Sequence, residues 1–315
     1  MSGLMTVFWK ELADHFCSKR FIILLSLIYL AGLSAVYVAL QTIRSEVTGT
    51  TELVFLRLFT TSGGVLPPFL VFIIFFIPIV GIALGFDSIN SERSSGTLSR
   101  ILSQPLFRDA VINGKFLAGL VTMGIMLVSI VTIIGGMGLR LIGVPPSSEE
   151  VWRILIFLGV CIIYGAFWMS LAVLFSILFE RTATSALAAI AIWIFFTFFM
   201  PMIAGLVADA IVPLSQSEAQ SNPALIVKHE EVERMILRIS PTTLFGEAMV
   251  TILVPTVRTL GPMLVRETTR MIPNPLPLRE SLLIVWPHLT SLIALTVICF
   301  AISYVKFMRQ EIRAT

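Results

Sequence analysis

The chain has 315 residues, of which 57% are hydrophobic and 13% charged, and its net charge is +3. Soluble globular domains have about 25% charged residues, so this composition excludes an ordinary soluble protein. The small net charge does not indicate a basic surface for binding nucleic acid. The three cysteines are scattered and have neither the pattern of a disulfide framework nor the paired spacing of a metal site. The apolar residues are gathered into long runs, which is typical of an integral membrane protein.

Residues 1–20 predict a helix that lies in the membrane interface. Phe8, Leu12 and Phe16 recur every four residues, and charged side chains such as Lys10 and Asp14 occupy the other side. The alternative is a soluble extension of the first span. The apolar run that follows is too long for the core of a cleaved signal peptide and is expected to stay as an anchor.

Six apolar runs are each long enough to cross a bilayer core of roughly 30 Å as a helix. None contains Asp, Glu, Lys or Arg, and His288 is the one histidine within them. The expected fold is therefore an all-α membrane protein with six transmembrane helices. The runs are Phe21–Leu40, Val65–Phe86, Phe116–Leu139, Ile154–Phe179, Ala183–Ala208 and Leu282–Val305. Five prolines within these runs (Pro67, Pro68, Pro78, Pro201 and Pro287) are expected to kink the helices.

The distribution of basic residues predicts the orientation. An even number of spans puts both termini on one side, and short loops on that side should carry the excess of Lys and Arg. Eleven basic residues lie on the side of the termini and four in the short loops opposite. Both termini and the loop 87–115 are therefore expected in the cytoplasm. The eleven are Lys10, Lys19, Arg20, Arg93, Arg100, Arg108, Lys115, Arg181, Lys306, Arg309 and Arg313.

The segment 209–281 is expected outside the cytoplasm, as a small cap. Ala224–Ile239 alternates charged and apolar residues with helical spacing, and Ser240-Pro241 should break that helix. Thr242–Val254 is mostly apolar but too short to cross fully, so a helix that enters only part of the bilayer is predicted. Nearer the fourth span, Ser147 and Glu150 have the spacing of a capping box. The predicted segments of the chain are thus 1–20, 21–208, 209–281 and 282–315, the last including a cytoplasmic tail.

The polar stretch between the second and third spans is where the protein can meet a soluble partner. Helix is expected to stop near Gly96, and Leu98, Ile101 and Leu102 then fall on one face of a short amphipathic helix that Pro105 ends. Asp87 and Glu92 are expected to pair with the arginines of the same stretch, Arg93, Arg100 or Arg108. The alternative is a solvated loop whose charges only set the orientation.

The order of residues in this stretch resembles the cytoplasmic loop of ABC-2 type transporter permeases. The matching residues are Glu92, Arg93, Gly96, Thr97, Leu98, Ile101, Leu102, Ser103, Pro105 and Arg108, followed by Gly114-Lys115. The whole chain is similar to that family, most of all to the subgroup that includes the nitrous-oxide reductase (multi-copper enzyme) maturation permeases. The resemblance implies an ABC-2, type V exporter-like fold.

This resemblance also implies a role and partners. The chain would be the permease of an exporter, with a second permease chain, the same or homologous, and two copies of an ATP-binding subunit. The loop would form the coupling helix that binds the ATPase, through Asp87, Glu92, Arg93, Gly96, Thr97, Leu98, Arg100, Ile101, Leu102, Pro105 and Arg108. The sequence has no P-loop of the form G-x-x-x-x-G-K-[ST]. ATP and Mg²⁺ would therefore belong to the partner, with no cofactor and no enzymatic site in this chain.

Three other functions compete with that of a permease. An intramembrane zinc protease is disfavoured, because His229-Glu230 is followed by Glu233 where H-E-x-x-H needs histidine. A copper site on Met123, Met126, Met200 and Met202 competes with simple packing of those side chains. A passive channel or ion-coupled carrier remains the main alternative, although carriers usually keep ionisable groups in their spans.

Overall fold

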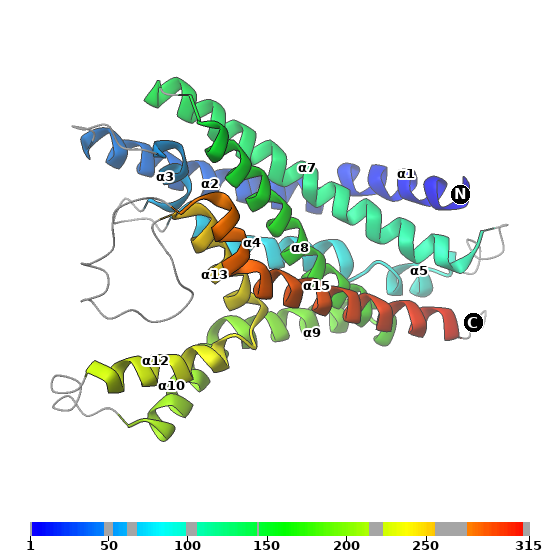
Figure 1. Cartoon of the computed structure of the whole chain (residues 1–315). Helices are drawn as coiled ribbons and strands as arrows, with labels where there is room; N and C mark the ends of the chain where they lie inside the picture. Colours follow the sequence, from blue (N-terminus) through cyan, green and yellow to red (C-terminus); the bar gives the residue numbers. More distant parts are fainter. Residues whose placement is uncertain are drawn as a thin grey trace. The chain divides into compact units, whose positions relative to one another are not determined.

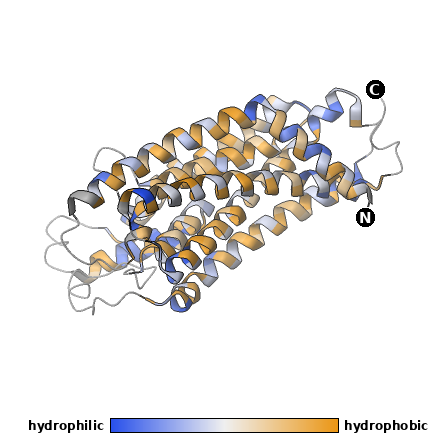
Figure 2. Ribbon diagram, turned by 90° about the horizontal axis from the view of Figure 1, so that it is seen from above, coloured by the Kyte–Doolittle hydropathy of each residue, from blue (hydrophilic) through white to orange (hydrophobic). Residues whose placement is uncertain are grey.

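The computed structural model describes residues 2–46, 53–61, 68–98, 106–143, 145–213, 223–255 and 276–310. In these ranges every regular element is helical (Figure 1). Six helices are long and apolar enough to cross a membrane: Lys19–Ile43, Phe69–Ser94, Arg108–Leu141, Ser148–Leu178, Thr182–Ile211 and Leu278–Arg309. Figure 2 shows hydrophobic residues along the long helices and hydrophilic residues toward their ends. The predicted all-α fold with six spans is confirmed.

The chain divides into two compact units, residues 1–191 with 291–315 and residues 192–290. The helices that lie mainly in the first unit are α1 (Ser2–Cys17), α2 (Lys19–Glu46), α3 (Val54–Thr60), α4 (Phe69–Gly85), α5 (Asn90–Ser94), α7 (Arg108–Ile142), α8 (Ser148–Leu178) and α9 (Thr182–Ile194). The second unit holds η1 (Phe195–Phe199), α10 (Met200–Ile211), α12 (Pro223–Leu237) and α13 (Pro241–Leu253). The last helix, α15 (Leu278–Arg309), passes from the second unit into the first.

Glycines let α4 and α8 approach closely. A Cβ on Gly81 would lie 2.7 Å from the carbonyl oxygen of Gly165, and one on Gly85 would lie 2.7 Å from that of Met169. Side chains larger than hydrogen are thus excluded at both positions. In membranes, where lipid is as apolar as the helices, small residues of this kind allow the close packing that holds helices together.

Helix α1 packs along α7. Val7 and Glu11 are buried, whereas Met5 and Trp9 are exposed. A Cβ on Gly114 of α7 would lie 2.9 Å from the Val7 side chain, so the two helices are in close contact. Val7 and Glu11 therefore face the protein, whereas the exposed side of α1 carries apolar Met5 and Trp9 together with the charged Lys10 and Asp14.

The loop between the first two spans contains α3, a seven-residue helix that was not predicted from the sequence. It buries Phe55, Leu58 and Phe59. Glu150 forms the predicted capping box with Ser147 and also accepts a hydrogen bond of 2.8 Å from the amide of Phe55. One carboxylate therefore starts α8 and holds α3.

Proline does not act as a kink at every predicted position. Pro68 is the N-cap of α4, which begins at Phe69, and Pro67 lies outside the described residues. The expectation that Pro68 lies within a span is therefore wrong, because proline fits a helix start where no amide donor is needed. Pro201 follows the π-helical turn η1, while Pro78 and Pro287 lie inside α4 and α15.

In the second unit, α12 and α13 are bent by 117° at the predicted Ser240-Pro241 break. Glu247 of α13 bonds to His288 at 2.7 Å and to Arg238 at 3.0 Å. His288 is thus hydrogen-bonded, as expected for this residue. His229 Nδ1 lies 3.0 Å from the carbonyl oxygen of Val212. This contact with a backbone oxygen is not the arrangement of a zinc protease site.

Candidate functional site

The polar stretch after α4 is fixed to the spans by buried hydrogen bonds. The chain turns over residues 86–89 and forms the short helix α5. The amides of Ile89 and Asn90 donate to the hydroxyl of Ser176, in α8, at 2.9 and 3.1 Å. Ser176 and Asn90 are both buried, so α5 cannot shift without disturbing α8.

Gly96 ends this stretch as predicted. Its φ of +70° lies in the left-handed region, where glycine avoids the clash of a Cβ with the backbone. Thr97 donates a hydrogen bond of 3.3 Å to the carbonyl oxygen of Glu92 and so closes the turn. Leu98 then enters a core with Val7, Val111 and Phe307 and is 2% exposed. Leu98 therefore anchors the loop within this chain and presents no side-chain surface to a partner in this conformation.

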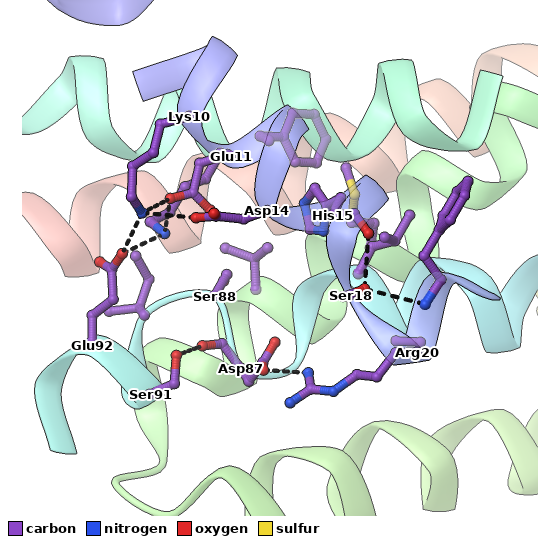
Figure 3. Close-up of a pocket in the computed structure, with 18 of the residues that line it drawn as sticks. Lys10, Glu11, Asp14, His15, Ser18, Arg20, Asp87, Ser88, Ser91 and Glu92 are labelled. Atoms are coloured by element: carbon purple, nitrogen blue, oxygen red, sulfur yellow. Dashed lines mark hydrogen bonds and ion pairs between the residues drawn. The ribbon is translucent and has the colours of Figure 1, made fainter. Parts of the chain in front are cut away.

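A lysine at the start of the third span holds two acids from other elements. Lys115 of α7 is 8% exposed, and its Nζ lies 2.8 Å from Glu11 of α1 and 2.8 Å from Glu92 of α5. Lys10 joins the group, 2.8 Å from Glu11, 3.2 Å from Asp14 and 3.8 Å from Glu92 (Figure 3). We call Lys10, Glu11, Asp14, Glu92 and Lys115 the charge cluster. It connects α1, α5 and α7, and the pairs of Lys115 with Glu11 and Glu92 have little exposure to water.

The electrostatics of the cluster favour its charged state. Burial by itself would lower the pKa of Lys10, but its bonds and charges toward Glu11, Asp14 and Glu92 raise that pKa above its ordinary value. Burial would likewise raise the pKa of Glu11, but Lys115 and Lys10 lower it below its ordinary value. At neutral pH Lys10 and Glu11 therefore keep their charges.

A second pair connects the loop to the first span. Arg20, at the start of α2, forms an ion pair with Asp87, and its guanidinium lies 5.0 Å from the ring centre of Phe86. Figure 3 shows Arg20 and Asp87 pointing toward each other across the site. The chain just after α4 is thus tied to α2 as well as to α1, α7 and α8.

The two arginines farther along reach other elements. Arg93 lies 3.7 Å from Glu180, in the short hinge between α8 and α9. Arg108 donates hydrogen bonds of 3.4 and 3.0 Å to the carbonyl oxygens of Met308 and Gln310. A cation at the end of α15 is favourable, because helix C-termini carry unpaired carbonyls and partial negative charge.

The structure corrects the expected pairing within the loop. Asp87 pairs with Arg20 and Glu92 with Lys115 and Lys10, whereas Arg93 and Arg108 bond elsewhere. The prediction that Asp87 and Glu92 pair with Arg93 or Arg108 is therefore wrong. It followed nearness in sequence, but the helix bundle brings the second half of α1 and the starts of α2 and α7 against Asp87 and Glu92.

Not all predicted site residues are described. Asp87, Glu92, Arg93, Gly96, Thr97, Leu98 and Arg108 are described, whereas Arg100, Ile101, Leu102 and Pro105 lie outside the described residues. Lys10, Glu11, Arg20 and Ser176 were not predicted from the sequence as residues of this site. One signal was present: Glu11 is four residues from Val7, and a charge on the same face as an apolar residue points to a buried partner.

A cavity of about 700 Å³ opens between these elements (Figure 3). Its lining carries His15, four Lys or Arg side chains and four acidic side chains: Lys10, Lys19, Arg20, Lys115, Glu11, Asp14, Asp87 and Glu92. Apolar side chains from α2, α4, α7 and α8 complete the lining. Within the described part of the chain, Ser88 Oγ and Glu92 Oε2 are buried and have no hydrogen-bond partner.

The methionines that could act as copper ligands are mostly packed against other side chains. Met123 and Met126 are buried, and a Cβ on Gly165 would lie 2.1 Å from the Met123 sulfur, which fills the space that this glycine leaves. Met202 of the second unit is 57% exposed. Among the described residues no group of three His, Cys, Asp or Glu side chains has the arrangement of a metal site.

Comparison with known proteins identifies the class to which this bundle and loop belong. The family model of ABC-2 family transporter proteins matches residues 5–312, which is nearly the whole chain. The chain therefore belongs to the ABC-2 transporter family, as a permease that is integral to the membrane.

A particular relative agrees with this assignment. The chain is 28% identical over 178 residues to NosY of Pseudomonas aeruginosa (strain PAO1), whose name is probable ABC transporter permease protein. The aligned part covers 54% of this chain and 58% of NosY, so the similarity spans a little over half the length of each.

Proposed function

We propose that this chain is the membrane-spanning subunit of an ABC exporter and that a separate ATP-binding subunit drives it by binding the loop between the second and third spans. The chain has no P-loop of its own, so pumping would take its energy, with ATP and Mg²⁺, from that partner. The excess of basic residues near the span ends supports a cytoplasmic location for this loop and for both termini.

The observation that carries the proposal is the charge cluster. Lys115 holds Glu92 of α5 and Glu11 of α1 at 2.8 Å each, with little exposure to water. A push on α5 is therefore passed to α1 and α7 through ion pairs that are costly to break when buried. Arg20 with Asp87, and Ser176 with Ile89, pass the same displacement to α2 and α8.

Different residues of the loop have different roles in this proposal. Arg93 is 40% exposed in its side chain, and Ser94 and Ser95 are exposed beside it, so they form the surface that the ATPase contacts. Gly96, Thr97 and Leu98 shape and anchor the loop. Arg100, Ile101, Leu102 and Pro105 keep the contact role that the family resemblance implies.

We propose the remaining features of the assembly from the resemblance to the family. Two ATP-binding subunits and a second permease chain, identical or homologous, would complete the exporter. The helices α12 and α13 would lie outside the cytoplasm, with α13 entering the bilayer edge.

Affinity purification from native membranes in mild detergent, followed by mass spectrometry, tests the proposal. A P-loop ATPase in stoichiometric amount is expected with the unchanged chain. Arg93→Glu should lose it, because the exposed cation becomes an anion at the contact. Arg309→Glu, a charge reversal at an exposed residue at the end of α15, should retain it. A chain that purifies intact and without any ATPase would instead support the channel or carrier function.

A further inference from the structure

The cavity beside the charge cluster has the chemistry of a lipid head-group site, and we propose that it binds the ethanolamine phosphate head group of a phospholipid. This inference concerns the cavity alone and does not depend on ATPase binding. It rests on three observations: the balance of charge in the lining, two buried polar atoms without partners, and the height of the cavity along the spans.

The lining is balanced in charge. Four acidic side chains and four Lys or Arg side chains line the cavity together with His15, so a ligand with a strong charge of one sign would meet repulsion as well as attraction. A zwitterion meets both signs at once. Ethanolamine phosphate carries a cationic ammonium and an anionic phosphate a few bonds apart, which matches such a lining.

Unused hydrogen-bonding groups show where each end would bind. Glu92 and Ser88 line the cavity, and Glu92 Oε2 and Ser88 Oγ have no hydrogen-bond partner in the described chain. Both atoms are buried, so each side chain has to rotate toward the cavity to meet a ligand. A buried unpaired carboxylate oxygen is costly, and an ammonium N–H donor removes that cost. Arg20 bonds Asp87 through Nη1, and its guanidinium has five N–H donors in all, so donors remain for a phosphate.

The cavity lies where the spans change from charged to apolar. Lys19 and Arg20 begin α2 just before its apolar run, Asp87 follows the apolar run of α4, and Lys115 precedes that of α7. The apolar part of the lining comes from span residues such as Leu24, Leu84 and Met169. A phospholipid at this height places its head group among the charges and its acyl chains along the spans.

Native mass spectrometry of the full chain, purified in mild detergent and exchanged into micelles with one added lipid, tests the proposal. Phosphatidylethanolamine should be retained at least about tenfold more than phosphatidylcholine, whose quaternary ammonium has no N–H donor for Glu92. Phosphatidylglycerol, which has no cation, should be retained no better than phosphatidylcholine. Equal retention of the three lipids would overturn the proposal.

Two variants on one helix locate the site. Leu24→Trp fills the apolar part of the cavity and should lower retention of phosphatidylethanolamine about tenfold. Leu27→Trp is the same change three residues on, at a side chain that is 42% exposed and outside the lining, and should behave as the unchanged chain. Equal loss or equal retention in the two variants would overturn the placement.

Soluble phosphoethanolamine separates the two sources of this head group. If the lipid is the ligand, soluble phosphoethanolamine at millimolar concentration leaves the thermal unfolding of the chain unchanged, while phosphatidylethanolamine raises its midpoint. If the soluble compound raises the midpoint as much, the cavity does bind ethanolamine phosphate. The proposal that a lipid supplies this head group is then overturned. The Ser88→Ala variant should reduce either effect severalfold, because it removes one buried hydroxyl partner.

Discussion

At the residue scale, Lys115 is the centre of the proposed transmission path. It is the shared partner of Glu11 and Glu92, and it is 8% exposed. Removing one member of a buried ion pair leaves an uncompensated charge, which costs more than the pair itself contributes. The lysine is therefore expected to matter for folding as well as for coupling.

Lys115→Met should lower the free energy of unfolding by about 3 kcal/mol, because two carboxylates of low exposure lose their main cation. Lys306→Met, at an exposed lysine of α15, should change it by about 0.5 kcal/mol or less. Thermal unfolding of both variants in detergent measures the difference. Equal midpoints for the two variants would show that the cluster does not hold α1 against α7.

The stability of the folded chain should fall as the pH drops below about 6.5, through His15. Burial lowers the pKa of His15, with Lys115 adding to this and Glu11, Asp87 and Asp14 opposing it. Because the unfolded chain then takes up a proton more readily than the folded one, acid favours unfolding. Glu11, whose pKa is also lowered, adds a separate loss only at lower pH, as its carboxylate is protonated.

Unfolding midpoints measured between pH 8 and pH 5 test this directly. His15→Gln should make the midpoint nearly independent of pH in that window while leaving it close to the unchanged chain at pH 8. A slope that persists in His15→Gln would assign the pH dependence to another group.

At the scale of elements, the contact of α4 with α8 depends on glycine. Gly85→Ala should destabilise the protein by about 1–3 kcal/mol, because the added methyl group meets the Met169 carbonyl oxygen at 2.7 Å and backbone cannot give way cheaply. Gly159→Ala, in α8, meets nothing within 4 Å and should be neutral or slightly stabilising, since alanine favours helix. Thermal unfolding of the two variants provides the measurement, and equal effects would exclude close packing as the cause.

The elements were largely predictable because their signals are local. The six spans are long apolar runs, the break at Ser240-Pro241 is a proline signal, and the Ser147–Glu150 capping box lies within four residues. Helix α3 was missed, because seven residues carry little periodicity and this helix is held by Glu150, which lies 95 residues away from Phe55.

The site was less predictable than the spans, for a related reason. The loop and the glycine turn at Gly96 could be located from sequence, but the partners of its charges could not. Glu92 bonds Lys115, 23 residues on, and Asp87 bonds Arg20, 67 residues before. Such pairs are set by how the helices pack, and periodicity within one helix holds no information on them.

At the scale of the whole molecule, membership of the ABC-2 family establishes a membrane-integral permease, and the proposed partner would supply the energy. The spans hold few ionisable groups, and in the first unit the charges that line the cavity lie near the ends of the helices. This arrangement suits a protein that is moved from outside its spans, because an ion-coupled carrier needs ionisable groups within them.

Site-specific photo-crosslinking in native membranes tests this account most directly. A photoreactive amino acid at Ser94, exposed beside Arg93, should crosslink to a P-loop ATPase, whereas the same group at Trp152, 60% exposed at the start of α8, should not. Trp152 is expected on the opposite side of the membrane, so the pair also tests the orientation. No ATPase crosslink from Ser94, or one from Trp152, would contradict the proposal that an ATPase drives this permease through the loop after α4.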